Sequence, residues 1–437
     1  MPKFAYLPCH PLLLLLFLIA PVLRAAERNT AYQAALDSIV AQEMGQTVDD
    51  LAGPKFEGRE AGSTGGHAAG DYLVEQLRKL PLKPAGEKQG YFQPFGNNCR
   101  NILAILPGSD PLLKDQTIVV GAHYDHLGHG RPHSNNPPGT IYPGADDNAS
   151  GTSGILELAR TFSSLPIAPG RSMLFVFFDG EEKGLLGAKH WTAHPTLPLS
   201  HVKFMLNFDM IGSLRAERVL VFGSRTACGL RRMASLGNQD EGLTLDFSWL
   251  MKANADHYPF YDHGIPTLFL HTDLHDRYHQ PTDVATKINR DGMMRVARLA
   301  FAILYERAEG SLPLRFRSVA KAENEDAHRR LEAVEPIARR AGDAPMRLGI
   351  AWRTDDAEPD TVVVSHVAAG SAAAAAGLRV GDRIYQIGGH DFADDTAFAK
   401  FARTLPGPLE LLVERDGQVR TVVMQFPSEA GKSKRTA

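Results

Sequence analysis

Short apolar runs alternate with stretches of helical periodicity through the middle of the chain. Runs rich in β-branched and aromatic residues predict strands over 117–122, 172–178, 202–208, 219–223 and 266–270. Apolar residues at helical spacing predict helices over 32–44, 66–80, 149–163, 185–192, 228–236 and 290–308. Several of the strands are apolar on both faces, which is typical of a mostly parallel sheet covered by helices. The pattern therefore predicts an α/β fold with a mostly parallel central sheet.

The N-terminal residues have the pattern of an export signal. Lys3 precedes an apolar run over 12–20, and small residues follow up to Ala25. We predict a signal peptide over 1–25 and a mature protein in the periplasm or outside the cell. An uncleaved N-terminal anchor is the alternative, because Arg24 is unfavourable at one of the possible signal-peptide cleavage sites. No later stretch approaches the roughly 18 continuous apolar residues of a membrane span, so we expect no stable membrane insertion after cleavage.

A change of composition after residue 312 marks a second domain. Residues 315–340 are charged, favour helix and contain few large apolar side chains, and short strands and turns follow them. At roughly 150 residues per domain, a chain of 437 residues holds two or three domains. We predict a larger domain over 26–312, a charged linker over 313–343, a small β-rich domain over 344–427 and a disordered tail over 428–437.

Charge and cysteine content narrow the function classes. Lysine and arginine number 47 against 50 aspartates and glutamates, the net charge is -3, and no basic stripe is present, so nucleic-acid binding is not expected. Cys9 lies in the leader, which leaves Cys99 and Cys228 for the mature chain. These two can form at most one disulfide, and the sequence leaves open whether they do.

Five clusters of acidic and imidazole residues lie at the ends of the predicted strands or in the loops after them. They contain His123 with Asp125, Asp146 with Asp147, Glu181 with Glu182, Asp209, and His279 with Asp283. Each cluster alone has an ordinary structural interpretation, such as a helix cap, first-turn acids or a turn. Open α/β sheets have their binding and catalytic sites at the carboxyl ends of their strands. Taken together, the five clusters favour a metal site over five unrelated loops.

The donor types indicate which metal and which chemistry. Imidazole mixed with carboxylate, without cysteine, suits zinc, with manganese or cobalt as substitutes. Four carboxylates exceed what one zinc needs, so two ions with one bridging carboxylate are expected. In an adjacent pair of glutamates, one can bind a metal while its neighbour takes a proton from water. This is the arrangement of a hydrolase.

The order of the motifs resembles the co-catalytic di-zinc aminopeptidases, metallopeptidase family 28. His-x-Asp, Gly-Ala-Asp-Asp-x-x-Ser-Gly, Glu-Glu, Asn-x-Asp-Met and Tyr-His-x-Pro-x-Asp follow one another here as in that family. The resemblance covers residues 51–306, including a leading glycine-rich segment over 57–65. It implies the zinc aminopeptidase fold, in which helices flank the central sheet, and peptide substrates with a free N-terminus.

The resemblance also implies a role for each site residue. Asp146 is the carboxylate that bridges the two ions, His123 and Asp209 complete the ligands of one zinc, and Glu182 and His279 complete those of the other. Glu181 is the general base, and Asp125 orients His123. Asp147 follows the bridging residue and is joined to it by a cis peptide. Asp256 and Phe260 match a segment near the substrate, without an assigned role. The protease-associated insertion of many secreted relatives has no room after residues 93–95.

Other histidines compete for these roles. We expect His126, His129 and His133 to be exposed rather than ligating, because they lie in or beside a polar loop rich in Gly, Pro and Asn. His275 is the nearest rival of His279, and the Tyr-His-x-Pro-x-Asp match favours His279.

The C-terminal segment 344–426 resembles a PDZ domain of the bacterial protease type. Met-Arg-Leu-Gly-Ile over 346–350 and the pattern Gly-Leu-x-x-Gly-Asp-x-Ile over 377–384 carry the resemblance. It implies that Leu348, Gly349 and Ile350 receive the carboxylate of an extended peptide, which adds a strand to a sheet edge. A domain that only packs on the peptidase is the alternative.

These observations predict an exported aminopeptidase with two zinc ions per chain and a PDZ domain that recruits a substrate or partner. Glutaminyl cyclisation with a single zinc is a second hypothesis, and the complete two-metal ligand set argues against it. A carboxypeptidase on the same scaffold, or a non-catalytic PDZ-bearing scaffold, are further alternatives.

Overall fold

The computed structural model describes residues 29–130, 136–311, 314–332 and 347–426. The signal peptide predicted over 1–25, the tail predicted over 428–437 and His133 lie outside these residues. Within the described ranges, no helix has both the length and the apolar character needed to cross a bilayer. Cys99 is buried, Cys228 is exposed, and both are free thiols.

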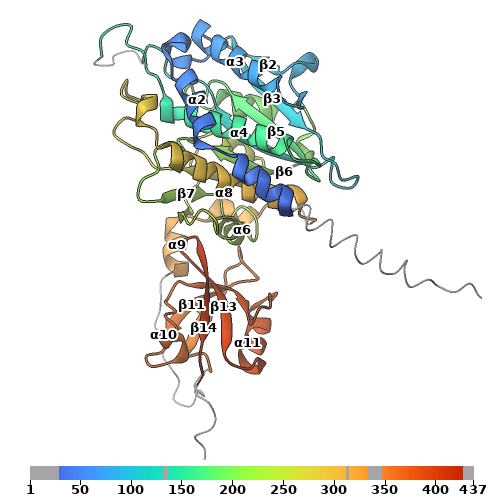
Figure 1. Ribbon diagram of the computed structural model, residues 1–437, viewed down its shortest axis with the longest axis vertical. Coiled ribbons are helices and arrows are strands. Elements are labelled where there is room, and N and C mark those ends of the chain that lie inside the picture. Colours follow the sequence, from blue (N-terminus) through green and yellow to red (C-terminus); the bar gives the residue numbers. More distant parts are fainter. Residues whose placement is uncertain (1–28, 131–135, 312–313, 333–346, 427–437) are drawn as a thin grey trace, which may run out of the picture.

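A twisted sheet forms the centre of the larger domain (Figure 1). Its strands are β1 (Lys83–Pro84), β2 (Phe92–Phe95), β3 (Cys99–Leu106), β4 (Thr117–His123), β5 (Ser172–Phe178), β6 (Val202–Phe208), β7 (Arg218–Phe222), β8 (Thr244–Ser248) and β9 (Thr267–His271). Their order is β1-β3-β5-β4-β6-β9-β7-β8, and β2 pairs with β3. The middle strands β5, β4, β6 and β9 are parallel, whereas β3 and β7 join them antiparallel. The sheet is thus mixed, with the predicted parallel strands at its centre.

Helices cover both faces of this sheet. They are a helix over 29–38, α2 (Ala41–Leu51), α3 (Thr64–Leu77), α4 (Gly151–Ser163), α5 (Leu186–Ala193), α6 (Leu230–Gly237), α7 (His257–Asp262) and α8 (Arg290–Glu309), with short turns η1 (Pro54–Arg59), η2 (Glu87–Gln89), η4 (Leu199–His201) and η5 (Ala285–Lys287) and a π-helical turn η3 (Ala145–Ser150). The helix predicted over 32–44 is interrupted at Ile39 and Val40, which are not helical.

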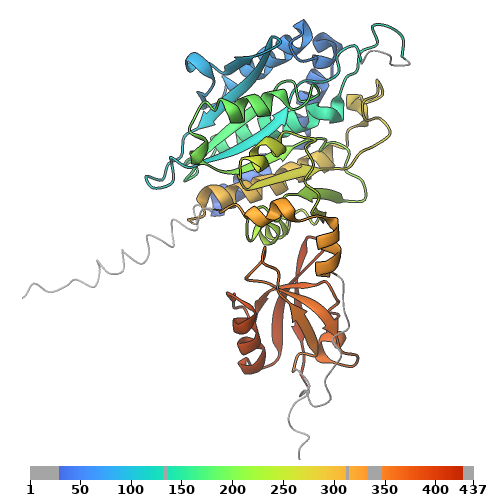
Figure 2. The same ribbon diagram turned by 180° about the vertical axis from the view of Figure 1, so that it is seen from behind.

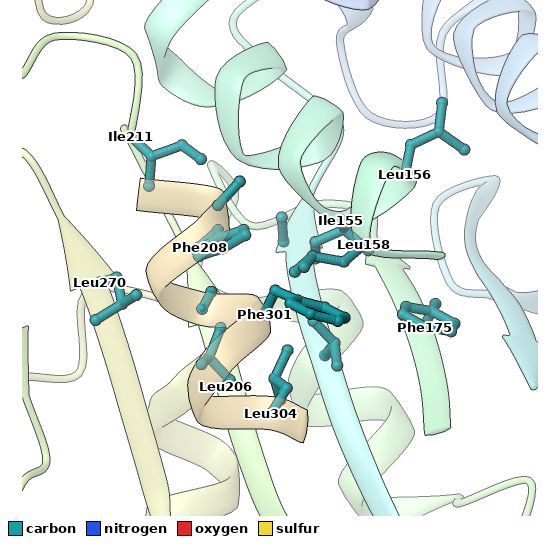
Figure 3. Packing of buried hydrophobic residues seen from close by; sticks show 14 of the residues in the cluster. Ile155, Leu156, Leu158, Phe175, Leu206, Phe208, Ile211, Leu270, Phe301 and Leu304 are labelled. Carbon is teal, nitrogen blue, oxygen red and sulfur yellow. The ribbon is translucent and has the colours of Figure 1, made fainter. Parts of the chain in front are cut away.

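Alternate side chains of the central strands enter two separate cores. On β5, Phe175 and Phe177 join the core beneath α4 and α8, while Val176 joins the core beneath α5 and α7. Figure 3 shows Phe301 of α8 in the first core, beside residues of α4 and β6. A strand buried on both faces needs apolar side chains at every position, which is why the sequence pattern located β4, β5 and β6 correctly.

The C-terminal domain is a separate antiparallel sheet with two helices (Figure 2). Its elements are β10 (Ile350–Arg353), β11 (Val362–Val367), α10 (Ala372–Ala375), β12 (Arg383–Ile387), α11 (Asp395–Thr404), β13 (Leu409–Arg415) and β14 (Gln418–Met424). The strands pair in the order β10-β11-β12-β13-β14. Their inner face forms a hydrophobic core of its own, which includes Phe398 of α11.

The start of the linker packs on the larger domain. It contains a turn η6 (Ser318–Ala322) and a helix α9 (Glu325–Glu332). The backbone oxygen of Ala320 accepts a hydrogen bond from the hydroxyl of Tyr261 at 3.1 Å. The ring of His328 stacks on Trp249, with 4.8 Å between the ring centroids.

Three arginines of the larger domain bind acidic residues of the C-terminal domain, and we call these contacts the arginine interface. Arg225 donates to both carboxylate oxygens of Asp355 at 2.6 and 2.8 Å, Arg231 to Glu414 at 3.1 and 3.2 Å, and Arg232 to Asp360 at 2.6 Å. The backbone N–H of Leu245 also donates to the carbonyl of Asp416. These contacts tie the two domains together.

The interface lies away from the carboxyl ends of the central strands. Strand β7 is antiparallel to β9, so the loop after β7, which carries Arg225, leaves the sheet at the opposite edge. Surface loops, rather than the C-terminal domain, therefore border the edge at which the predicted site residues gather.

Candidate metal site

The predicted site residues converge at the carboxyl edge of the parallel strands. His123 is the last residue of β4, Glu181 and Glu182 follow β5, and Asp209 follows β6. His279 lies in the segment after β9, and the two aspartates of η3 precede α4. Because the four middle strands are parallel, their loops meet at one edge, as the sequence predicted.

Asp147 occupies the centre of the cluster. Its Oδ1 lies 3.3 Å from Nε2 of His123, and its Oδ2 lies 3.0 Å from Nε2 of His279. On one side, Oδ1 of Asp209 is 3.5 Å from Nε2 of His123. On the other side, Oε1 of Glu182 is 3.1 Å from Nε2 of His279. We call His123, Asp147 and Asp209 site one, and Asp147, Glu182 and His279 site two.

The bridging position that the resemblance implied for Asp146 therefore belongs to Asp147, one residue later. The carboxylate of Asp146 accepts hydrogen bonds from the backbone N–H of Gly212 at 2.7 Å and from Ser150 Oγ at 3.0 Å. Its other oxygen lies 2.8 Å from Nε2 of His275. These contacts turn Asp146 away from the cluster. The cis peptide expected before Asp147 lies after it, between Asp147 and Asn148.

Asp283 of the fifth cluster and Arg59, which the sequence analysis did not single out, hold this loop in place. Asp283 accepts the backbone N–H groups of Asp146 and Asp147 at 3.0 to 3.1 Å. Arg59 is completely buried and donates to the carbonyls of Leu51, Tyr124, Pro143 and Gly144. The guanidinium thus connects the segments that carry His123 and Asp147. The only sequence signal for it is its place in the glycine-rich segment 57–65.

Asp125 contacts the glutamate pair as well as His123. Its Oδ1 accepts the backbone N–H of Glu181 at 3.1 Å, and its Oδ2 accepts that of Glu182 at 3.4 Å. Nδ1 of His123 is 3.1 Å from the backbone oxygen of Asp125 and 3.7 Å from its carboxylate. The backbone carbonyl therefore lies nearer to the imidazole than the carboxylate that was expected to orient it.

The ionisable groups of the cluster perturb one another strongly. Burial alone would lower the pKa of His123, but Glu181 and Asp209 outweigh it and raise this pKa well above its usual value. Burial would raise the pKa of Asp147, but His123 and His279 hold it well below its usual range. Burial, assisted by Asp209, raises the pKa of Glu181 well above its ordinary value. A carboxyl group with a raised pKa is suited to take up and release a proton near neutral pH.

The donor set fits zinc. Three carboxylates and two imidazoles, all largely buried, face one another within the distances given above. Such groups are expensive to bury unless a cation neutralises the carboxylates. Nitrogen and oxygen donors in this mixture are those that zinc takes in hydrolytic enzymes. His123, Asp147 and Asp209 would hold one ion, and Asp147, Glu182 and His279 a second.

The competing histidines differ in burial and in their contacts. His129 is exposed, as predicted, and His275 binds Asp146 rather than the cluster. The prediction that His126 is exposed is wrong. Its side chain is completely buried, and its Nδ1 lies 3.0 Å from Oε1 of Glu182. The glycine-rich segment that begins at Glu57 covers this histidine, since the carbonyl of Arg59 accepts the N–H of His126.

The two residues left without a role differ in environment. Asp256 is buried, neither of its carboxylate oxygens has a hydrogen-bond partner among the described residues, and burial raises its pKa well above the usual value. Phe260 stacks on Trp191 with ring centroids 5.4 Å apart and belongs to the core beneath α5 and α7. Phe260 is therefore a packing residue.

In the C-terminal domain, Leu348, Gly349 and Ile350 lead into β10, which is the terminal strand of its sheet. Leu348 and Ile350 are buried in the domain core. Gly349 has a φ of 75°, a conformation that favours glycine, and a Cβ there would meet Ser371. Helix α11 contacts this strand through Phe398, whose ring packs edge-on against Trp352 at 5.0 Å.

Two protein-family models match the chain. Residues 101–304 match the model of peptidase family M28, and residues 363–415 match that of a PDZ domain. The chain carries an M28 peptidase domain followed by a PDZ domain. A probable leucine aminopeptidase of Arthroderma otae is 28% identical over 268 residues, which cover 58% of this chain and 69% of that protein.

Solved structures show the same fold. The LapA aminopeptidase of Legionella pneumophila superposes with a TM-score of 0.54 at 23% identity, covering 65% of this chain and 75% of that one. A glutaminyl cyclase of Porphyromonas gingivalis gives a TM-score of 0.50 at 20% identity, covering 61% and 98%. Because both activities occur on this fold, the M28 fold alone does not choose between them, and the site residues must.

Proposed function

We propose that this chain is an exported zinc-dependent aminopeptidase that uses two zinc ions and Glu181 as its general base. The M28 domain and the leucine aminopeptidase relative support a metallo-aminopeptidase. The observation that carries the proposal is the position of Asp147, whose two carboxylate oxygens face His123 on one side and His279 on the other. Two complete ligand sets that share one carboxylate favour hydrolysis with two ions over cyclisation with one.

The chain's own residues divide the catalytic work. Zinc bound at the two sites would supply Lewis-acid polarisation of the scissile carbonyl. Glu181 then takes a proton from the attacking water and delivers it to the leaving amine, so that the glutamate is regenerated. The two hydrogen bonds from the backbone of the glutamate pair to Asp125 hold Glu181 and Glu182 in fixed positions.

Export rests on the sequence alone. The leader pattern over 1–25 favours a periplasmic or extracellular enzyme.

The PDZ domain is proposed to recruit an extended peptide or a partner's C-terminus. The terminal strand β10 and the glycine turn at Gly349 support this role, because β-strand addition needs a sheet edge and a turn that presents backbone N–H groups. The arginine interface places the PDZ domain away from the catalytic edge, so we expect recruitment rather than a direct contribution to the substrate pocket.

A panel of unblocked and N-acetylated aminoacyl substrates tests the catalytic proposal, with zinc-loaded and chelated protein compared side by side. Metal-dependent cleavage of only the unblocked substrates is expected. Cleavage of C-terminal residues instead, or cyclisation of N-terminal glutamine without hydrolysis, would replace the proposal by one of its alternatives.

The Glu181→Gln variant tests the general base. It should keep its metal content and lose about 10²- to 10⁴-fold in kcat, the usual contribution of general acid-base catalysis. Retained turnover in a metal-replete variant would remove Glu181 from the mechanism.

Binding of labelled C-terminal peptides to the full chain tests recruitment. Peptides with a free carboxylate should bind, and the same peptides with an amidated C-terminus should not. Equal binding of both forms would remove the carboxylate from the recognition, and no binding by either would leave the PDZ domain with a packing role.

A further inference from the structure

His126 is a buried group beside the cluster that the five-residue ligand set leaves unexplained. Its side chain is completely inaccessible to solvent. Neither ring nitrogen has a hydrogen-bond partner among the described residues. Nδ1 lies 3.0 Å from Oε1 of Glu182 without the alignment of a hydrogen bond, and 3.8 Å from Oδ2 of Asp147. A buried imidazole without hydrogen bonds is unfavourable unless another group binds it.

The surrounding backbone holds this imidazole against site two. The N–H of His126 donates to the carbonyl of Arg59 at 3.1 Å. Gly144 has a φ of 57°, and a Cβ there would come within 2.5 Å of the imidazole ring. A side chain at residue 144 would therefore displace the ring. The ring of His279 also approaches it, with 5.8 Å between the centroids.

We propose that His126 is a sixth metal ligand, which adds a second imidazole to site two. The proposal rests on the proposed function, since it concerns the same pair of ions. Site two would then offer four protein donors, from Asp147, Glu182, His279 and His126. Site one would offer three, from His123, Asp147 and Asp209.

The two ions are therefore not equivalent. Four protein donors are typical of a closed zinc site, whereas three leave a position for water or substrate. Site two would act as the tightly held ion, and substrate would be activated chiefly at site one.

Metal affinity of matched variants tests the proposal. His126→Ala is compared with His129→Ala, which changes an exposed histidine three residues further along the same segment. In zinc titrations against a competing chelator, the affinity of His126→Ala for one of its two zinc ions should fall by more than about 100-fold. This threshold is set because loss of a supporting group outside the ligand set already costs 10- to 100-fold in affinity. His129→Ala should match the unmodified chain. A loss of less than 100-fold would make His126 a supporting residue and overturn the proposal.

A measurement on the unmodified chain avoids any folding defect of the variant. In the Co²⁺-loaded protein, each ligating imidazole contributes one strongly shifted exchangeable N–H proton to the NMR spectrum. Three such signals are expected, from His123, His126 and His279, and two would overturn the proposal.

The two readouts also separate this inference from the proposed function. Two bound ions with only two shifted signals would reject His126 alone. Two bound ions with three shifted signals, but no hydrolysis of unblocked substrates, would reject the aminopeptidase proposal alone.

Discussion

The metal site and the arginine interface both bury several carboxylates, but they neutralise them differently. At the interface, burial would raise the pKa of Asp355, and Arg225 outweighs it and lowers this pKa. The same balance lowers the pKa of Glu414 beside Arg231. In the metal site the outcome is divided: His123 and His279 lower the pKa of Asp147, whereas burial raises the pKa of Asp209 even though His123 opposes it.

The difference shows how to separate a structural acidic cluster from a functional one. An arginine is charged at every relevant pH and belongs to the chain, so the acids at the interface are neutralised within the protein. The acids of the metal site face imidazoles, which are themselves ligands. The guanidinium of Arg59, which lies nearby, donates its hydrogen bonds to backbone carbonyls. These carboxylates therefore need a cation from outside the chain.

The largest effect should follow from breaking the metal site at its centre. Asp147→Asn removes the charge of the carboxylate shared by both sites, so we expect zinc affinity to fall by more than about 100-fold and turnover to be lost. Asp146→Asn changes a carboxylate outside the cluster and should cost about 10- to 100-fold in affinity. Zinc titration against a chelator measures both. The reverse order of the two effects would restore Asp146 as the bridge.

Breaking the interface should cost stability but spare catalysis. Arg225→Ala leaves Asp355, which is 2% exposed, buried without its cation. Removing one partner of such a pair costs about 3–5 kcal/mol. We expect the free energy of unfolding of the full chain, measured in urea, to fall by this amount. Alternatively, the PDZ domain should unfold in a separate transition at a lower urea concentration. Zinc affinity should not change, because Arg225 lies at the edge of the sheet opposite to the metal site.

Arg218→Ala is the matched control for this variant. Arg218 pairs with Asp246 and Asp273 on the surface, and all three side chains are 44% to 48% exposed. Exposed pairs contribute about 1 kcal/mol or less. An equal loss of stability in the two variants would show that burial does not distinguish the interface from the surface.

A further effect should appear in the pH dependence of stability. Burial, assisted by Asp360 and Asp355, raises the pKa of Glu358 to about 8. One of its oxygens accepts the N–H of Arg231, and the other has no hydrogen-bond partner among the described residues. The folded chain therefore binds this proton more tightly than the unfolded chain, so the contribution of Glu358 is full below its unfolded pKa and is lost as pH rises towards 8.

Glu358→Gln should remove this dependence, because the amide stays neutral. The difference in unfolding free energy between the variant and the unmodified chain should be near zero at pH 5 and should grow in favour of the variant up to pH 8, by at most about 1.4 kcal/mol per pH unit. Urea unfolding at several pH values measures it. A constant difference would mean that Glu358 does not titrate in this range.

The sequence predicted the parallel core and the five clusters of acidic and imidazole residues that converge at one edge of the sheet, because both depend on local patterns. Strands β4, β5 and β6 are apolar at nearly every position, and each ligand segment follows a strand or precedes a helix. The pattern predicted none of β1 to β3. The first two are short, both contain proline, and they pair only at the margin of the sheet.

By itself, the sequence determined the donor types, their order and their common edge of the sheet. The tertiary structure decided which neighbouring residue faces the centre and which loop residue is buried. Asp147 rather than Asp146 lies between the histidines because Gly212, Ser150 and His275 hold the other carboxylate. His126 is buried because residues about seventy positions earlier in the chain cover it. Such choices depend on contacts between distant segments, and no local pattern of side chains encodes them.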